Sequence, residues 1–387
     1  MEYVYMSQLI SRATAGLVAV IIGFTSSIAL IYQVVMVLGG TPDLVASWVL
    51  MLGLAMGLSS IALSYYYKVP ILIAWSTTGA ALLISSAQGY SLNQAVGAFM
   101  FSAALVFLSG ITGIFEKMMN KIPSQLACAM LAGVLVNFGI DVFNFMNELP
   151  LVIGLMVAVY LCGKRYFPRF AMLAVVVAGF LMAGLTGQID TTSWQWRMSE
   201  FAYIAPEFDL NAMISVGLPL FIVTMTSQNL PGIAVLKAHH YKAPVSAALN
   251  VTGLLNVIIA PFGGYAINLA AITAAICMSP EADKDPSKRY WASIAGGVFY
   301  IIMALLAATL VGLVASLPQA LILALAGIAL FATIASSLQQ ALTEAYYTEA
   351  AIVTFLVTAS NLTLFSVGSA FWGIVAGTVT LVMTRKD

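Results

Sequence analysis

The chain has 387 residues, of which 61% are apolar and only 8% are charged, and its formal net charge is zero. Because roughly a quarter of the residues in an ordinary soluble domain are charged, this composition excludes a soluble globular protein. The zero net charge and the lack of a basic arm also give no reason to expect a nucleic-acid partner.

Long apolar stretches recur along the chain, and they predict membrane-spanning helices. A helix needs about 20 residues to cross a hydrocarbon layer of ~30 Å, and the run "LVAVIIGFTSSIALIYQVVMVLGG" at 17–40 is long enough. Such a continuous run does not alternate as a membrane β-strand does. The fold class that we expect is therefore an all-α polytopic membrane protein.

Turn residues and charges divide the chain into about fourteen expected crossings. The expected crossings are 13–38, 44–66, 69–88, 93–115, 123–141, 149–163, 170–187, 211–236, 243–260, 261–279, 290–315, 318–340, 346–361 and 365–384. With the N-terminus inside, this count puts every Lys and Arg except Arg197 on the cytoplasmic side. We therefore expect a multi-pass protein with both termini in the cytoplasm.

Equal numbers of crossings on either side of a long outer loop predict an inverted repeat. The first repeat would be 1–187, the outer loop 188–210 and the second repeat 211–387. The hydroxyl-rich "FTSSIAL" of the first crossing matches the position of "TMTSQNL" in the eighth. The two halves would then start on opposite sides of the membrane.

The third and tenth crossings, "KVPILIAWSTTGAALL" and "IAPFGGYAINLAAITAAI", share a plan. Each has a proline, a stretch suited to extended backbone, and then an Ala-rich helix that would start near the middle of the membrane. Ser76, Thr77 and Asn268 suit capping positions, and two facing helix starts would attract an anion. Alternatively, Pro70 and Pro261 merely kink two complete helices.

The stretch "TMTSQNLPG" places amides and hydroxyls in the middle of the eighth crossing. We expect Gln228 and Asn229 to supply neutral donors and acceptors, and Pro231 with Gly232 to break the helix. The alternative is that these groups join membrane helices to each other. Trp75 and Tyr265 could cover an apolar ring, although packing roles are equally common for aromatic residues.

Signatures of catalysis are missing: the sequence has no zinc-protease, nucleophile-elbow or P-loop motif and no Cys or His cluster with metal spacing. We therefore expect that the protein is not an enzyme and that it binds no cofactor and no metal. The acid that we single out for proton coupling is Glu344, which desolvation could make a proton carrier, although a solvated turn is the alternative.

Over essentially its full length, the chain resembles the benzoate membrane transport family. The resemblance rests on three strings: "TSQNLPG", "VPILIAWSTTGAAL" and "APFGGYAINLAAITAAI". The resemblance implies a benzoate/proton symporter of the bacterial inner membrane, related to nucleobase and sulfate transporters. It further implies fourteen segments in two inverted repeats of seven. Segments 1–4 and 8–11 would form a core domain and segments 5–7 and 12–14 a gate domain, which move by an elevator mechanism.

The resemblance also implies a substrate site between the third and tenth segments, beside the first and eighth. The implied residues are Ser26, Ser27, Trp75, Ser76, Thr77, Thr78, Ser227, Gln228, Asn229, Tyr265, Ala266 and Asn268. Nucleobase carriers of that fold have an acidic residue on the eighth segment, where this chain has Gln228 and Asn229. This departure fits a carboxylate substrate, but it leaves the proton carrier open.

The function that we expect is uptake of benzoate or a related aromatic carboxylate together with a proton. The alternatives are the same fold with another cargo, such as a nucleobase or an inorganic anion, and a passive anion channel. The expected partners are the substrate, the proton and the lipid bilayer, and whether the chain forms a homo-oligomer is left open.

Overall fold

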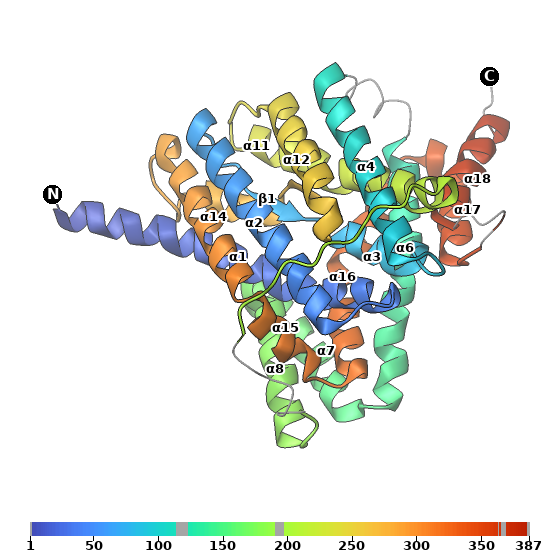
Figure 1. Ribbon diagram of the computed structural model, residues 1–387, viewed down its shortest axis with the longest axis horizontal. Coiled ribbons are helices and arrows are strands. Elements are labelled where there is room, and N and C mark those ends of the chain that lie inside the picture. The colour runs from blue at the N-terminus through green and yellow to red at the C-terminus, as the bar shows by residue number, and fades with distance from the viewer. Residues whose placement is uncertain (1, 114–122, 190–196, 363, 365–368, 385–387) are drawn as a thin grey trace.

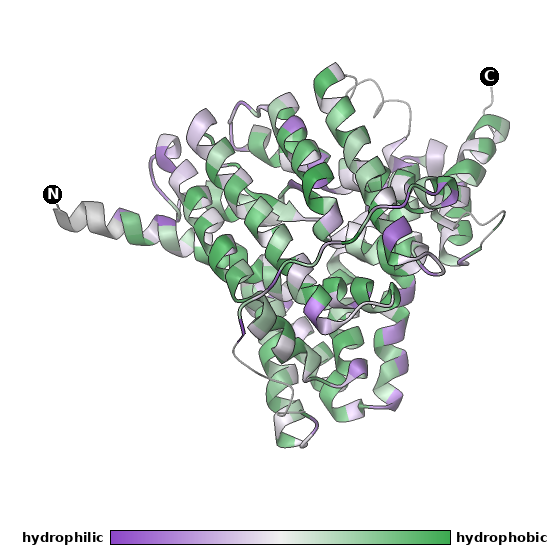
Figure 2. Cartoon of the chain, viewed as in Figure 1, coloured by the Kyte–Doolittle hydropathy of each residue, from purple (hydrophilic) through white to green (hydrophobic). Residues whose placement is uncertain are grey.

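Helices make up most of the computed structural model, which describes residues 2–113, 123–189, 197–362, 364 and 369–384. Hydrophobic residues cover these helices, whereas hydrophilic residues gather mainly at helix ends and in the connections between helices (Figure 2). This distribution is what a lipid environment requires, because the helix satisfies its own backbone groups and presents apolar side chains outward.

The first half of the chain contains long helices and one short strand. Its elements are α1 (Glu2–Val37), α2 (Pro42–Tyr67), β1 (Ile73–Trp75), α3 (Thr77–Ser86), α4 (Leu92–Thr112), α6 (Ser124–Asn144), α7 (Pro150–Tyr166) and α8 (Ala171–Leu185), with short 3₁₀ turns at Phe145–Asn147 and Pro168–Phe170.

The second half of the chain is divided into more and shorter helices. Its elements are α9 (Leu210–Ala212), α10 (Leu218–Thr224), α11 (Leu230–Ala238), α12 (Val245–Ile259), β2 (Ile267–Leu269), α13 (Ile272–Met278), α14 (Tyr290–Leu305), α15 (Ala307–Ala315), α16 (Gln319–Ala341), α17 (Thr348–Ala359) and α18 (Ser369–Thr384). Two π-helical turns, η3 (Met213–Gly217) and η4 (Met225–Asn229), join α9, α10 and α11, and 3₁₀ turns lie at Ala260–Phe262, Pro286–Lys288 and Ala345–Tyr347.

Seven helices within the described residues are long and apolar enough to cross a membrane, or eight if one bent pair is a single span. The bent pair joins α14 to α15 at an angle of 63°, within the stretch 290–315 that we expected to be one crossing. Four further apolar helices of the described residues are shorter than a full span, namely α3, α8, α17 with the turn before it, and α18. A polytopic helical membrane protein is confirmed, and the number fourteen stays a prediction.

The packing contacts divide the helices into two groups; in Figure 1, α2, α4, α12 and α14 lie above, and α7 and α8 lie below. In one group α2 packs on α14, α4 packs on α12, and α1 packs on α14 and α3. In the other group α6 packs on α16, α17 and α18, and α7 packs on α8. The two groups meet where α1 contacts α16 and where α3 contacts α6.

The two strands, one from each half of the chain, pair with each other in the interior. They are antiparallel, with Ile73 opposite Leu269, Ala74 opposite Asn268 and Trp75 opposite Ile267. Beyond the ladder, the Ala270 amide donates to the Leu72 carbonyl over 2.9 Å. This pairing brings the starts of α3 and α13 into one region of the protein.

Polar side chains from neighbouring helices complete the edges of this small sheet. Ser60 of α2 accepts from the Ile73 amide over 2.8 Å. On the other edge, Asn256 of α12 donates to the Ile267 carbonyl (2.9 Å) and accepts from its amide (2.7 Å). An open strand edge costs several kcal/mol per unpaired group in an apolar environment, so these side chains allow the sheet to exist inside the bundle.

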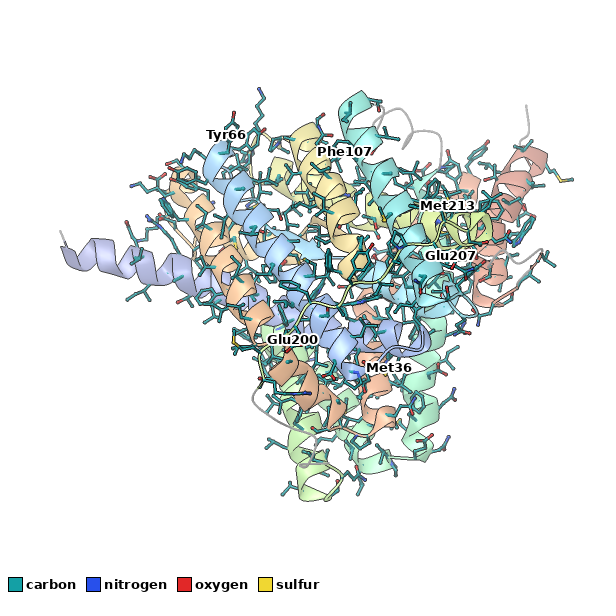
Figure 3. All side chains as sticks on the ribbon, in the orientation of Figure 1. Met36, Tyr66, Phe107, Glu200, Glu207 and Met213 are labelled. Atoms are coloured by element: carbon teal, nitrogen blue, oxygen red, sulfur yellow. The ribbon has the colours of Figure 1, made fainter. Side chains whose placement is uncertain are left out.

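An extended segment, residues 197–209, crosses the outside of α2 and α12 and is here called the strap (Figures 1 and 3; Glu200 and Glu207 are labelled in Figure 3). The Ala202 amide donates to Ser47 of α2 (2.8 Å), and the Glu207 amide donates to the Asn93 carbonyl of α4 (3.0 Å). The Ser199 hydroxyl accepts from the Ala308 amide of α15 over 2.7 Å. The strap is therefore bound to helices from both halves of the chain.

Candidate functional site

The N-terminus of α3 lies inside the protein and is capped by Ser76. The Ser76 hydroxyl accepts from the Gly79 amide over 2.9 Å, and the Ser76 amide donates to the Ala266 carbonyl over 3.0 Å. Ser76 is fully buried, and its cap of α3 confirms the prediction at this position. The first-turn amides of a helix have no acceptor within that helix, so this end carries partial positive charge.

Side chains from three elements meet at this helix start, and we call Ser27, Thr77, Thr78, Ser227 and Gln228 the hydroxyl site. The Ser27 and Thr77 hydroxyl oxygens are 2.7 Å apart, and those of Thr78 and Ser227 are 3.0 Å apart. The Gln228 amide nitrogen donates to the Thr78 hydroxyl over 3.3 Å. The structure thus joins α1, α3 and η4 through neutral hydrogen-bonding groups alone.

The eighth segment does not break at Pro231 and Gly232, so that prediction was wrong. The chain stays helical and widens instead into the π-helical turn η4, in which the Leu230 amide donates to the Met225 carbonyl. Pro231 has no N–H for the regular bond to the Ser227 carbonyl, and a π turn is a common way to absorb such a defect. Gly232 permits close packing, because a Cβ there would lie 2.6 Å from that of Leu269.

Asn268 does not cap α13, and this prediction was also wrong. Strand β2 extends to Leu269, so Asn268 lies in the sheet opposite Ala74, and the residue at the cap position is Ala271. No side chain accepts a hydrogen bond at that cap, and α13 is only seven residues long. The amide group of Asn268 is fully buried without a hydrogen-bond partner among the described residues.

Several other residues of the predicted site hold the sheet and α3 in place. The Asn229 side chain accepts from the Leu269 amide (3.1 Å), and the Tyr265 hydroxyl donates to the Ser76 carbonyl (3.0 Å). Trp75 is 3% exposed and packs on Phe24, with 4.6 Å between the ring centroids. Ser26 belongs to α1, and its side chain is outside the described part of the structure.

Glu344 lies at the turn before α17, away from the residues of the hydroxyl site in the hydrogen-bond network. Its carboxylate accepts from the Gln125 side chain of α6 over 2.6 Å, and the residue is exposed. The structure therefore places it between α6 and the end of α16 rather than beside α3.

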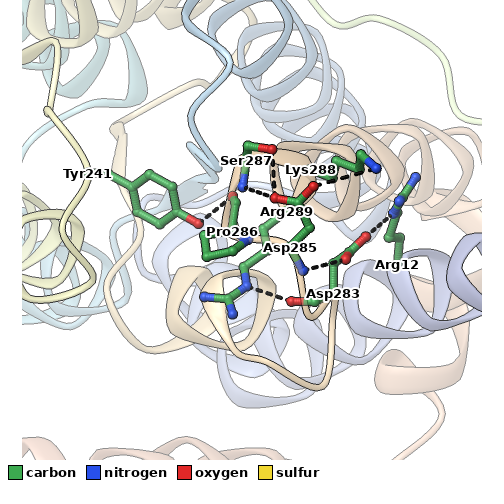
Figure 4. Close-up of polar contacts among 8 residues, drawn as sticks. All are labelled: Arg12, Tyr241, Asp283, Asp285, Pro286, Ser287, Lys288 and Arg289. Carbon is green, nitrogen blue, oxygen red and sulfur yellow. Dashed lines mark hydrogen bonds and ion pairs between the residues drawn. The ribbon is translucent and has the colours of Figure 1, made fainter.

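Buried charges occur instead at the end of α13 and the start of α1 (Figure 4). The Arg12 guanidinium donates to the Asp283 carboxylate over 2.6 Å, and both side chains are at most 9% exposed. Arg289 donates to the Asp283 and Met278 carbonyls, both over 2.7 Å. A cation at the C-terminal carbonyls of a helix is favourable, so this cluster fixes the end of α13.

A polar cavity of about 750 Å³ lies at the other end of α3, and our sequence analysis did not identify it. Its walls include the C-terminal part of α3, the second half of α6, the start of the eighth segment and the start of α18. None of the hydroxyl-site residues lines it. Its acids, Asp141 and Asp209, could have been found as carboxylates at the ends of two expected crossings.

The comparisons with known proteins agree with this architecture. Over 369 residues the chain is 46% identical to the "Inner membrane protein YdcO" of Escherichia coli (95% of this chain, 94% of that protein). It is 34% identical over 377 residues to the "Benzoate membrane transport protein" of Acinetobacter baylyi (97% of this chain, 96% of that protein).

Solved structures share the fold at low sequence identity. The transmembrane domain of the cyanobacterial bicarbonate transporter BicA has a TM-score of 0.60 at 14% identity and covers 96% of this chain and 97% of its own. SLC26A9 has a TM-score of 0.62 at 14% identity and covers 97% of this chain and 66% of its own. At such identities the likeness shows the fold alone. The family pattern described as "Benzoate membrane transport protein" matches residues 7–383, and the chain therefore belongs to the benzoate membrane transport protein family.

Proposed function

We propose that this membrane transporter moves benzoate or a closely related aromatic carboxylate, with a proton, across the bacterial inner membrane, and that the hydroxyl site binds the carboxylate. The observation that supports this assignment best is the neutral, donor-rich start of α3, where Ser76 caps the helix and Thr78 meets Ser227 and Gln228. The name of the Acinetobacter relative supports the substrate class.

The chemistry of this site suits an anion that carries an apolar ring. Hydroxyl and amide donors can reorient toward a carboxylate, and the helix start adds partial positive charge without a fixed cation. No carboxylate is among the five residues of the hydroxyl site, so nothing there repels the substrate. Apolar side chains of the surrounding helices would cover the ring.

The proton removes an energetic penalty of anion uptake. A negative charge that moves inward against the membrane potential loses ~2.3 kcal/mol per 100 mV, and one accompanying proton cancels this term. Glu344 is one candidate carrier, since the Gln125 side chain already holds its carboxylate against α6.

The proposed movement is a displacement of one helix group past the other. The core would comprise expected segments 1–4 and 8–11, which run from α1 to α4 and from α9 to α15, and the gate would comprise segments 5–7 and 12–14, which run from α6 to α8 and from α16 to α18. The close packing of α2 on α14 and of α6 on α16 supports two units of this kind. In this proposal the hydroxyl site travels with the core.

Uptake of labelled benzoate into proteoliposomes tests the proposal. We expect uptake that an inward proton gradient accelerates and that unlabelled benzoate inhibits better than uracil or sulfate. Unitary currents in planar bilayers would indicate a channel instead, and uptake that ignores the proton gradient would contradict symport.

Thr78→Val tests the site itself, because it removes the hydroxyl that bonds to Ser227 and Gln228 while keeping the shape of the side chain. A hydrogen bond to a charged group contributes about 1.5–3 kcal/mol, so we expect KM to rise roughly 10- to 100-fold. The matched control is Thr252→Val in α12, where the buried hydroxyl bonds only to carbonyls of its own helix. Equal KM values in the two variants would contradict the assigned site.

A further inference from the structure

Tyr300 of α14 has a buried hydroxyl for which the described residues provide no hydrogen-bond partner. The residue is only 1% exposed. Tyr265 is equally buried, but its hydroxyl donates to the Ser76 carbonyl over 3.0 Å. Buried hydroxyls are nearly always paired, because a hydroxyl that loses water without gaining a partner is unfavourable. A bound ligand is one source of the missing partner.

The Tyr300 hydroxyl lies against α1, on the helix face that also carries Ser27. A Cβ placed on Gly23 would lie 3.2 Å from the Tyr300 oxygen. Ser27 follows Gly23 by four residues in α1, so the two positions lie one above the other on the same face. The Ser27 hydroxyl belongs to the hydroxyl site, where it meets Thr77. The Tyr300 hydroxyl is therefore roughly one helical turn, about 5.4 Å, from the level of the hydroxyl site.

Aromatic rings connect Tyr300 to the start of α3. Phe24 follows Gly23 in α1, and its ring centroid is 6.1 Å from that of Tyr300 and 4.6 Å from that of Trp75. Trp75 directly precedes the cap residue Ser76. The three rings are at most 3% exposed, so an aromatic substrate that packs on them is shielded from water.

The face of α1 beside the Tyr300 hydroxyl is open at Gly23, which is itself partly exposed. Outside α1, only two heavy atoms of the described residues lie within 4 Å of a Cβ placed on Gly23. They are the Tyr300 oxygen and, at 3.9 Å, the methyl carbon of Thr273 in α13. A methyl carbon offers no hydrogen bond. A polar group at this position would therefore find its partner in the Tyr300 hydroxyl.

The separation between the hydroxyl site and Tyr300 matches the length of a substituted benzoate. If the carboxylate lies at the hydroxyl site, the ring extends along Phe24, and ring position 4 is the position farthest from the carboxylate. An oxygen on ring position 4 lies about one helical turn from the carboxyl carbon. Such a hydroxyl can donate to Tyr300 or accept from it, because every hydroxyl has one donor and two acceptor sites.

We propose that Tyr300 selects aromatic acids that carry a hydroxyl at ring position 4, such as 4-hydroxybenzoate, over acids with an apolar group there. This inference rests on the proposed function and narrows its substrate class. A site that hydrogen-bonds a substrate hydroxyl rejects an analogue without it, because the polar group of the site is then left unpaired. A purely apolar pocket distinguishes such substituents weakly. Tyr300 is thus a specificity-determining residue.

Competition with labelled benzoate uptake into proteoliposomes tests this role in the unmodified protein and in Tyr300→Phe. The competitors are 4-hydroxybenzoate, 4-methylbenzoate and 2-hydroxybenzoate. The 4-methyl group matches the size of the 4-hydroxyl without its hydrogen bond. The hydroxyl of 2-hydroxybenzoate lies beside the carboxylate, out of reach of Tyr300.

We expect the unmodified protein to bind 4-hydroxybenzoate about 5- to 10-fold more tightly than 4-methylbenzoate, as one neutral hydrogen bond allows. In Tyr300→Phe the two inhibition constants should agree within about twofold. The inhibition constant of 2-hydroxybenzoate and the KM of benzoate should change by less than about twofold. Because the lost hydroxyl has no partner among the described residues, Tyr300→Phe should not lower Tm in detergent.

The matched control is Tyr160→Phe in α7, which removes the hydroxyl of a buried tyrosine in the other helix group. Tyr160 is 7% exposed and its ring packs on Phe331. This variant should keep the preference of the unmodified protein for 4-hydroxybenzoate.

Gly23→Ala tests the open face of α1 without changing Tyr300. Its methyl group would lie 3.2 Å from the Tyr300 oxygen, in the space that we assign to the substituent at ring position 4. We expect the inhibition constants of 4-hydroxybenzoate and 4-methylbenzoate to rise about tenfold, and that of 2-hydroxybenzoate to change much less. Alanine favours the helix more than glycine does, so the variant should fold.

Three results would overturn the inference. The unmodified protein could fail to prefer 4-hydroxybenzoate over 4-methylbenzoate. Tyr300→Phe could keep the preference, which would mean that the hydroxyl meets only water. Tyr300→Phe could also weaken all aromatic acids alike, which would place the hydroxyl at the carboxylate. If neither labelled benzoate nor labelled 4-hydroxybenzoate is taken up by the unmodified protein, the proposed function fails, and the inference fails with it.

Discussion

The two strand-and-half-helix units, β1–α3 and β2–α13, occupy corresponding places in the two halves of the chain and differ in chemistry. At the start of α3, Ser76 caps the helix and two threonines follow it. At the start of α13, Ala271 is the cap residue and no side-chain hydrogen bond forms. Helix α3 has ten residues and α13 has seven.

The two units thus share a backbone plan, a short strand followed by a short helix, but they do not share the polar groups at the helix start. In the second half, polar groups lie on the flanking elements: Asn256 of α12 holds β2, and Gln228 of η4 reaches α3. The hydroxyl site is therefore built around one helix start. The second unit supports it, since the Tyr265 hydroxyl and the Ala266 carbonyl both bond to the backbone of Ser76.

The largest expected effect is a loss in the free energy of unfolding when the side chains that hydrogen-bond to the two strands are removed. Asn256→Ala leaves both the amide and the carbonyl of Ile267 without their partner, whereas Ser60→Ala leaves only the Ile73 amide. At about 1–3 kcal/mol per unsatisfied buried group, we expect losses of roughly 4 and 2 kcal/mol in the free energy of unfolding.

Denaturant-induced unfolding in detergent measures both losses. The matched control is Asn250→Ala in the same helix, because the Asn250 side-chain oxygen has no hydrogen-bond partner among the described residues. We expect it to cost less than about 1 kcal/mol. A loss as large as that of Asn256→Ala would show that the Asn256 hydrogen bonds are not the cause.

A smaller effect is expected from Ser76→Ala, which removes the cap of α3 and keeps the backbone bond to Ala266. The loss of a cap costs about 1 kcal/mol, and the first turn of α3 should become less ordered. We expect a fall in Tm of a few degrees and a several-fold rise in KM for benzoate uptake. An unchanged KM would indicate that the helix start does not contact the substrate.

The smallest effect is expected from Ala271→Ser, which offers α13 the cap that it lacks. The backbone at Ala271 has φ −105° and ψ −67°, outside the extended region in which a cap residue bonds best. We therefore expect a change in stability within about 0.5 kcal/mol and no change in KM. A marked change in KM would place the start of α13 at the binding site and remove the asymmetry described above.

The sequence predicted the backbone plan of these units well, because proline, extended residues and an Ala-rich run have clear local preferences. Ser76 was a reliable cap signal, since its hydroxyl needs only the amide three residues later. The cap predicted at Asn268 was wrong because this residue pairs with Ala74, which is distant in sequence, and so remains part of β2. Local preference could not show where the strand stops.

The same limit explains the error at Pro231 and the missed cavity. A proline without its hydrogen bond predicts a break, but the segment stays helical by widening into a π turn, and Gly232 packs closely against Leu269. The polar cavity combines residues from elements that are far apart along the chain, such as Asp141 and Asp209. Only the tertiary arrangement brings them together, and the fourteen-segment topology remains a prediction.

The short connection between α8 and the strap limits how far the two helix groups can separate in the proposed movement. On the α8 side, the Gln188 amide donates to the Ala183 carbonyl over 2.8 Å. On the strap side, the Arg197 carbonyl accepts from the Thr309 hydroxyl over 3.4 Å. The chain between these anchors can span at most roughly 30 Å. In the proposed movement, α8 can therefore be displaced relative to the helices under the strap only as far as this connection permits.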